Sequence, residues 1–220
     1  YPEPLRAALE AEKSGANSVT IHLREDRRHI RDYDLKNIKK KLKIPLNLEI
    51  APTNEMLNIA IKNKPDFVCI VPEKRKELTT EGGLNILKSK KILKKIISKL
   101  KKNKIRISLF IEPQLSNVEL AFMLGVDCVE LHTGTFCNLF NKKHKRKTEV
   151  VYIKIKHCAA FAKNLGLDVH AGHGLTYKSA YQISKIEEIS EFNIGHFIVA
   201  ESIFVGLKKS IKQFKKIINK

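Results

Sequence analysis

Short apolar runs alternate with amphipathic stretches along almost the whole chain. A short apolar run bounded by turn residues is typical of a strand buried on both faces, whereas apolar residues three and four positions apart indicate a helix with one buried side. The runs predict strands over 18–23, 45–50, 67–71, 106–111, 128–132, 168–171 and 192–196. The stretches between them predict helices over 4–14, 34–42, 53–64, 87–102, 117–124, 149–164, 177–185 and 202–219, with a basic loop over 142–147.

Strands that alternate with helices predict a parallel sheet built from βα units. We therefore expect an α/β fold, a (β/α)8 TIM barrel with extra helices that forms a single domain over residues 1–220. Such a barrel has eight strands, but the pattern shows seven and the chain opens with a helix, so the first strand is expected upstream of Tyr1. A doubly wound open sheet is the alternative, weakened because no GxGxxG motif follows the first predicted strand.

The chain is strongly basic, with 42 Lys and Arg against 23 Asp and Glu and a net charge of +19. Only eight of the 42 are Arg, the residue that binds phosphates and bases through a planar fork. The lysines gather on the predicted helices 87–102 and 202–219, between apolar residues at helical spacing, which favours solvated helix faces. A basic nucleic-acid-binding protein remains the alternative, but the chain has no Trp and 7% aromatic residues to stack on bases.

No apolar stretch is long enough to span a membrane, and we find no secretory signal peptide. The four cysteines show no CxxC spacing, so neither a zinc ribbon nor a disulfide framework is indicated. Two of them fall inside predicted strands, which favours buried, reduced thiols and a cytoplasmic protein. The cysteines are Cys69, Cys128, Cys137 and Cys158.

Ionisable residues mark the carboxyl ends of the predicted strands, where barrel enzymes carry their chemistry. An ionisable side chain in a buried strand is costly unless it is paired or used. Taken singly, each is more simply a hydrogen-bonded structural residue, and Glu73 within PEKRKE is expected to be solvated. Together they predict a site for several proton transfers. The residues are His22, Glu49, Glu73, Glu112, Glu130, His132, His170, His173 and His196.

Two kinds of loop predict anion binding beside these groups. Glycines in AGHG (171–174) and NIGH (193–196) would let backbone N–H groups approach a phosphate after the last two strands, although ordinary tight turns explain them too. Three arginines in HLREDRRH (22–29) favour a second phosphate site, with a self-neutralising surface loop as the alternative. The segment ELTTEGG (77–83) is expected to be a mobile lid or a plain surface excursion.

Several of these segments together resemble the pyridoxine 5′-phosphate synthases of vitamin B6 biosynthesis. The matching stretches are TIHLREDRRHI (20–30), NLEI (47–50), VPEKRKELTTEGGL (71–84), ELHTG (130–134), AGHGLTY (171–177) and NIGHFIVA (193–200). The resemblance implies a cytoplasmic TIM-barrel enzyme that assembles as a homo-octamer. It implies condensation of 1-deoxy-D-xylulose 5-phosphate with 3-amino-2-oxopropyl phosphate, releasing phosphate and water, with no cofactor or metal and with no membrane or specific nucleic-acid partner.

The same resemblance assigns roles to individual residues. His22 and Glu49 match acid–base catalysts, His173 matches a proton donor, and Glu130 matches a residue that stabilises the transition state. Contacts to the deoxyxylulose phosphate match Arg24, His29 and Thr79, and contacts to the aminoketone phosphate match Gly174, Gly195 and His196.

Two departures from the family pattern stand out. The family's first strand, which binds both substrates, is not found before Tyr1, and we expect it upstream. His170 stands where the family usually has Asn; with His173 it forms a His-x-x-His pair that suits a metal, but we expect it to keep the hydrogen-bonding role of the amide. Another sugar-phosphate barrel enzyme is the runner-up, although no predicted strand ends in the lysine that a Schiff-base aldolase needs.

Overall fold

The computed structural model describes residues 3–73 and 82–218, which hold a seven-stranded parallel sheet. The strands are β1 (Val19–His22), β2 (Leu46–Ile50), β3 (Phe67–Ile70), β4 (Arg106–Ile111), β5 (Cys128–His132), β6 (Asp168–Gly172) and β7 (Ile189–Asn193). The helices are α1 (Pro4–Lys13), α2 (Asp32–Lys41), α3 (Asn54–Asn63), α4 (Ile86–Lys102), α5 (Leu115–Leu124), α6 (Gly134–Asn141), α7 (Lys145–Asn164), α8 (Tyr177–Ile183), α9 (His196–Val205) and α10 (Leu207–Ile218).

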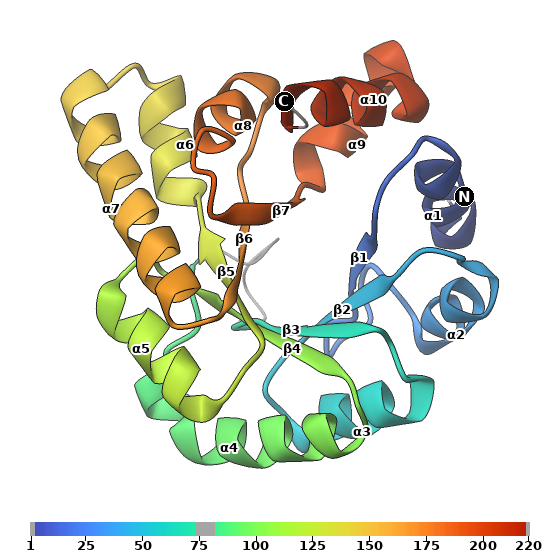
Figure 1. Ribbon diagram of the computed structural model, residues 1–220. Coiled ribbons are helices and arrows are strands. Elements are labelled where there is room, and N and C mark those ends of the chain that lie inside the picture. The colour runs from blue at the N-terminus through green and yellow to red at the C-terminus, as the bar shows by residue number, and fades with distance from the viewer. Residues whose placement is uncertain (1–2, 74–81, 219–220) are drawn as a thin grey trace.

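Each strand pairs in parallel with the next one along the chain, from β1 to β7. Figure 1 shows the sheet curling so that the helices surround its outer face. The two edge strands of the described sheet also meet, because the hydroxyl of Thr20 on β1 donates to Asn193 Oδ1 on β7 at 2.9 Å. The sequential strand order and the curl confirm the TIM-barrel-like fold with extra helices and exclude the doubly wound sheet. A strand upstream of Tyr1 stays a prediction.

Alternate residues of a strand face opposite sides of the sheet, and β2 shows what this does here. Leu46, Leu48 and Ile50 belong to the large apolar core between the sheet and the helices. Asn47 and Glu49 lie on the other face, where the Asn47 amide reaches Thr20 and the Glu49 carboxylate reaches a histidine of β1. The apolar positions therefore anchor the strand, and the polar positions between them enter the inside of the curled sheet.

Local signals set several helix ends as predicted. The Thr53 hydroxyl accepts a hydrogen bond from Met56 N at 3.3 Å, so Thr53 is the N-cap of α3. Gly125 adopts a left-handed conformation with φ of 75° and ends α5. Both ends were predicted from the sequence.

The region after β5 and the C-terminal region differ from the prediction. The strand expected over 192–196 lies earlier, as β7, and His196 opens α9. The helix expected over 202–219 is two helices, which part at Gly206 with φ of 80°. Helix α6 was not predicted, and the expected basic loop over 142–147 includes the first turn of α7. The reason for the error at α9 is its composition, HFIVAESIFV, which is apolar on all sides and shows no helical periodicity.

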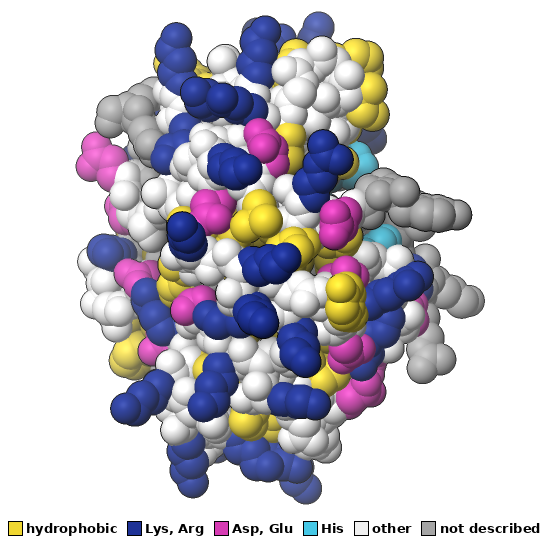
Figure 2. Space-filling view, turned by 90° about the vertical axis from the view of Figure 1, so that its right-hand side faces the viewer, with side chains coloured by type: hydrophobic (Ala, Val, Ile, Leu, Met, Phe, Trp, Pro, Cys, Tyr) yellow, Lys and Arg dark blue, Asp and Glu magenta, His cyan; other side chains and the backbone are white. Residues whose placement is uncertain are grey.

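The outside of the molecule carries the basic charge in dispersed form. Figure 2 shows Lys and Arg side chains spread over one face, with acidic and hydrophobic side chains between them. The four cysteines are free and buried, and burial was expected for Cys69 and Cys128 because they fall inside predicted strands. Of the described helices, none is both long and apolar enough to cross a lipid bilayer.

Candidate active site

Parallel pairing places the ionisable residues of neighbouring strands side by side at the carboxyl end of the sheet. His22 lies opposite Glu49 in the register of β1 with β2, and His22 Nδ1 is 3.6 Å from Glu49 Oε2. Glu130 lies on β5, whose last residues pair with those of β6 that lead to His173. The four residues predicted to be catalytic therefore gather at one end of the sheet.

Two carboxyl groups form the centre of this cluster. Burial raises the pKa of Glu49 to about 7, and burial together with the nearby Glu49 raises the pKa of Glu130 to about 8. Glu130 Oε2 accepts a hydrogen bond from Asn193 Nδ2 at 2.8 Å, and the Cys69 thiol lies 3.7 Å from the same oxygen. At neutral pH, Glu130 is therefore mostly protonated, and Glu49 exchanges its proton readily.

Gly172 makes room for the Glu130 carboxyl. A Cβ at position 172 would lie 2.0 Å from Glu130 Oε1 and 3.3 Å from Asn193 Cβ. The strand end thus needs glycine for a close approach. This packing also places Glu130 next to the turn that carries His173.

His173 occupies a strained turn between Gly172 and Gly174, with φ of 77° in the left-handed region. The Thr133 hydroxyl lies 2.8 Å from the Gly172 carbonyl oxygen and 2.7 Å from that of His173, and it donates to them. Thr133 N also donates to the Gly172 carbonyl at 2.9 Å. Burial, with help from the nearby His132 and His196, lowers the pKa of His173, so its imidazole is mainly neutral at pH 7.

The side of the cluster near β1 holds a buried ion pair. Arg24 and Glu73 have side chains that are 1% and 2% exposed, and Arg24 Nε is 3.7 Å from Glu73 Oε1. Glu73 Oε2 is also 3.6 Å from His22 Nε2, and burial raises the Glu73 pKa. Burial and the charge of Arg24 lower the pKa of His22 to about 4, which keeps this imidazole neutral. The expectation that Glu73 is solvated is wrong, because the segment containing Arg24 folds over it.

The other arginines of HLREDRRH are engaged by carboxylates. Arg27 donates to Asp32 at 2.8 Å and to Glu55 at 2.6 Å, and Arg28 pairs with Asp26. For Arg27 and Arg28 these contacts favour the self-neutralising loop. Arg24 is the arginine of this segment that lies at the strand ends, beside Glu73. His29 lies near enough to His22 to lower the pKa of His22.

A second carboxylate–imidazole pair lies between β4 and β5. Glu112 Oε1 is 2.7 Å from His132 Nδ1 and accepts a hydrogen bond from Gly83 N at 2.9 Å. The hydrogen bond from His132 lowers the pKa of Glu112, which is therefore ionised at neutral pH. The ring centroids of His132 and His173 are 5.0 Å apart.

The predicted glycine loops lie next to His173. Gly174 has φ of 78° and is exposed, and Gly195 is the exposed N-cap of α9. His196, the first residue of α9, is near enough to His173 to lower its pKa. The structure thus brings Gly174, Gly195 and His196 to the site, whereas Thr79 lies outside the described residues.

Sequence reasoning did not select five residues that hold the site together. Glu73, Glu112 and His132 were noted only as strand ends, because a single polar residue gives no sign of its partner. Asn193 and Thr133 carried no signal beyond lying inside the recognised stretches NIGHFIVA and ELHTG. His170 Nδ1 is 3.9 Å from Glu191 Oε1. Within residues 3–73 and 82–218, no group of three or more His, Cys, Asp or Glu side chains is arranged to hold a metal ion.

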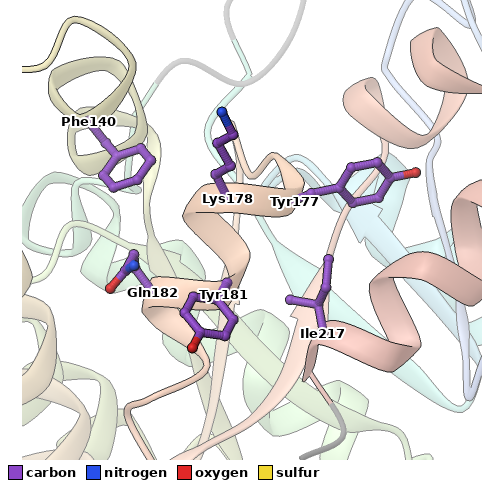
Figure 3. Close-up of a pocket in the computed structure, with 6 residues that line it drawn as sticks. All are labelled: Phe140, Tyr177, Lys178, Tyr181, Gln182 and Ile217. Atoms are coloured by element: carbon purple, nitrogen blue, oxygen red, sulfur yellow. The ribbon is translucent and has the colours of Figure 1, made fainter.

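A separate pocket lies away from the strand ends, among helices. Figure 3 shows it between α6, α8 and α10. Aromatic and aliphatic side chains dominate its lining, which carries none of the clustered carboxylates and imidazoles. Its lining residues are Phe140, Tyr177, Lys178, Tyr181, Gln182 and Ile217.

Known proteins resemble this chain over its whole length. The model of the family described as pyridoxal phosphate biosynthesis protein PdxJ matches residues 1–220. The pyridoxine 5′-phosphate synthase of Pelagibacter ubique is 56% identical over 220 residues, covering 100% of this chain and 91% of that protein. The enzyme of the same name from Zymomonas mobilis is 48% identical over 219 residues, covering 100% and 84%.

Solved structures of much lower sequence identity share the fold. Phosphoribosylanthranilate isomerase from Thermotoga maritima matches with a TM-score of 0.61 and 14% identity, over 98% of this chain and 93% of that one. At this identity the likeness concerns the architecture alone.

Proposed function

The chain belongs to the PdxJ family of pyridoxal phosphate biosynthesis proteins and is an enzyme of pyridoxine 5′-phosphate synthesis, and from this we propose its substrates and catalytic residues. The substrates are 1-deoxy-D-xylulose 5-phosphate and 3-amino-2-oxopropyl phosphate, which condense to pyridoxine 5′-phosphate with release of phosphate and water. The observation that carries the proposal is the juxtaposition of the partly buried Glu49 and the buried Glu130, with pKa values of about 7 and 8, beside two neutral histidines, His22 and His173.

The condensation needs proton transfers at nearly every step. The amine attacks a ketone and water leaves to give an imine; carbanion formation, phosphate elimination, water addition and an aldol-type closure of the pyridine ring follow. General acids and bases work best when their pKa lies near the pH of the reaction. A Glu49 pKa of about 7 lets this group take a proton in one step and return it in another.

The other three groups divide the remaining work. Neutral His22, 3.6 Å from Glu49, accepts or passes on a proton as its partner in acid–base catalysis. Protonated Glu130 donates a hydrogen bond to the oxygen on which negative charge develops in the transition state. His173 returns a proton to the substrate after taking one up, and its rigid turn fixes the position of the ring.

Two phosphates need two anion sites. We assign the aminoketone phosphate to Gly174, Gly195 and His196, where exposed backbone N–H groups and the N-terminus of α9 favour an anion. We assign the deoxyxylulose phosphate to Arg24, His29 and Thr79, of which Arg24 and His29 lie in the segment between β1 and α2. The buried Arg24 guanidinium supplies a fixed positive charge there.

The direct test is incubation of the purified protein with both phosphorylated substrates while the absorbance of a pyridine product is followed. We expect product only when both substrates are present, together with one inorganic phosphate for each pyridine formed. Controls omit each substrate in turn. A protein that forms no pyridine from this pair, but forms it from another sugar phosphate, would contradict the substrates proposed here.

We also propose that the enzyme is a cytoplasmic homo-oligomer, an octamer by resemblance to its family. Four free, buried cysteines support a reducing compartment. Helix α9 supports self-association because Val199, Ile203 and Phe204 expose apolar side chains to solvent in the single chain. Sedimentation of the purified protein gives its assembly state, and a monomer at micromolar concentration would contradict this proposal.

A further inference from the structure

We propose that His132 contacts a phosphorylated substrate through Nε2 and that Glu112 is the positioning residue that fixes the His132 proton on Nδ1. The inference rests on the proposed condensation and adds a group at the same site. Neither residue is among those that the family resemblance selects.

The contact between Glu112 and His132 determines which ring nitrogen carries the proton. Glu112 Oε1 lies 2.7 Å from His132 Nδ1, and an ionised carboxylate can only accept a hydrogen bond. In its neutral form, the imidazole therefore carries its proton on Nδ1 and presents a lone pair on Nε2. The Gly83 N–H, 2.9 Å from the same oxygen, holds the carboxylate in place from a second direction.

The other nitrogen, Nε2, is an unused acceptor in a buried position. The His132 side chain is 7% exposed, and its Nε2 has no hydrogen-bond partner among the described residues. A buried polar atom without a partner is costly and uncommon in a folded protein. A bound ligand that donates a hydrogen bond to Nε2 removes this cost.

The position of Nε2 points to the reacting substrate rather than to a structural partner. His132 Nε2 and the His173 ring both pack against Gly134, where a Cβ would lie 2.5 Å from His132 Nε2 and 2.7 Å from His173 Cδ2. The two ring centroids are 5.0 Å apart. A hydroxyl or amino group held beside His173 is therefore within reach of His132, and these are the donors that the two substrates carry.

Two substitutions of His132 separate its two nitrogens. Asn places its amide near the position of Nδ1, so His132→Asn keeps a donor to Glu112 and loses Nε2. Gln reaches toward the position of Nε2, so His132→Gln restores an acceptor there. We expect His132→Asn to lower kcat/KM about tenfold to a hundredfold, and His132→Gln to recover part of this loss. His157→Asn, at an exposed position of α7, serves as the matched control and keeps wild-type values.

Glu112→Gln tests the positioning role. Its amide can also donate to Nδ1 and so allow the opposite tautomer, in which Nε2 carries the proton and no longer accepts. We expect about a tenfold lower kcat/KM with the fold intact, and a limb of the pH–rate profile due to His173 that moves to lower pH, because the lost carboxylate raised the His173 pKa. Glu119→Gln, exposed on α5, is the control. Wild-type kinetics in both His132→Asn and Glu112→Gln would overturn the proposal.

Nitrogen NMR of the wild-type protein labelled in its histidine rings keeps the test independent of how well the variants fold. We expect the neutral His132 ring to be protonated on Nδ1, and its Nε2 signal to shift when one substrate is added. Separate titrations with each substrate show which one supplies the donor. A proton on Nε2 in the free protein, or no shift with either substrate at saturation, would overturn the proposal. If the proposed condensation itself is wrong, the wild-type protein forms no pyridine product, and this result is distinct from a failure of the His132 proposal.

Discussion

The ionisable side chains at the amino ends of the strands differ in environment from those at the carboxyl ends. At the amino ends, Asp66 accepts a hydrogen bond from Leu46 N at 2.9 Å, and Asp127 accepts one from Ile107 N at 2.8 Å. Both contacts join the start of one strand to the residue before the next. At the carboxyl ends, burial raises the pKa of Glu49 and Glu130 to about 7 and 8. Asp66 is thus stabilised as an anion at the amino end, because the Leu46 N–H and Lys39 lower its pKa. At the carboxyl end, Glu49 and Glu130 keep their protons close to neutral pH.

The arginine–carboxylate pairs show the same contrast. Arg106 and Asp168, at the amino ends of β4 and β6, form an ion pair with side chains 48% and 41% exposed. Arg24 and Glu73, beyond the carboxyl ends of β1 and β3, are almost fully buried. Water screens the first pair and reaches little of the second. At the amino ends, polar groups link neighbouring strands to one another. At the carboxyl ends, ionisable groups are shielded from water, and their pKa values are shifted toward those that proton transfer needs.

Removing the central groups of the carboxyl end gives the largest expected effect. Glu49→Gln and His173→Ala each lower turnover by about a hundredfold or more, because each removes a proton-transfer group. Both are read from steady-state kinetics of pyridine formation, with circular dichroism to show that the fold is kept. Wild-type turnover in both folded variants would refute the assignment of the site.

The pH dependence of stability tests the raised carboxyl pKa values. Folded Glu130 keeps its proton up to about pH 8, whereas the unfolded chain releases it above its ordinary pKa near 4.5. Its contribution to stability is therefore full below pH 4.5 and is lost as the pH rises through 8, by at most about 1.4 kcal/mol per pH unit. In Glu130→Gln, the free energy of unfolding falls less steeply from pH 5 to pH 8.

Denaturant unfolding at several pH values measures this slope. Glu119→Gln, which changes an exposed carboxylate of α5, is the control and should follow the wild-type slope. If Glu130→Gln follows the same slope as well, Glu130 is ionised in the folded state, and the contrast between the two ends of the sheet fails at its central residue.

The strained turn at His173 should respond to loss of its hydroxyl contact. Thr133→Val keeps the shape of the side chain and removes the donor to the carbonyls of Gly172 and His173. We expect about tenfold lower turnover and a loss of about 1–2 kcal/mol in the free energy of unfolding, because a buried acceptor loses its partner. Thr148→Val on α7 is the matched control, because the Thr148 hydroxyl donates a hydrogen bond to the His144 carbonyl at an exposed position. Equal kinetics in the two variants would show that Thr133 does not position His173.

The smallest effect is expected at the amino end. Arg106→Gln breaks a half-exposed ion pair, and we expect a change of about 0.5 kcal/mol in the free energy of unfolding. Turnover stays at the wild-type value, because the pair lies at the opposite end of the sheet from the reacting groups. A loss of turnover comparable to that of Glu49→Gln would show that the two ends are not separate in function.

The order of the elements was predictable because parallel βα units give a regular alternation of apolar runs and amphipathic stretches in the sequence. The strands predicted over 106–111 and 128–132 have the same bounds in the structure, because their apolar runs are clear. Helix α9 was not, because a helix that is apolar all round has no period to detect. The pattern of strand ends also predicted which catalytic candidates would meet, since parallel strands end at one edge.

The partners of those candidates were not predictable. The Glu73 carboxylate contacts Glu25 N, His22 and Arg24, which come from β1 and the segment after it, and nothing in PEKRKE predicts these contacts. Glu112, directly after β4, contacts His132 on β5 and accepts a hydrogen bond from Gly83 in the loop before α4. Such contacts depend on side-chain direction and on the curl of the sheet, which local sequence does not specify.

The sequence by itself therefore determined the βα order, the inward-facing positions of each strand and the identity of the groups available for catalysis. These follow from short-range regularities, the two-residue period of strands and the spacing of helices. Only the tertiary structure decided which carboxyls are neutral, which imidazole nitrogen is free and which arginines are already paired. Those properties come from burial and from charges contributed by distant parts of the chain, so they exist only once the sheet has curled and brought its strand ends together.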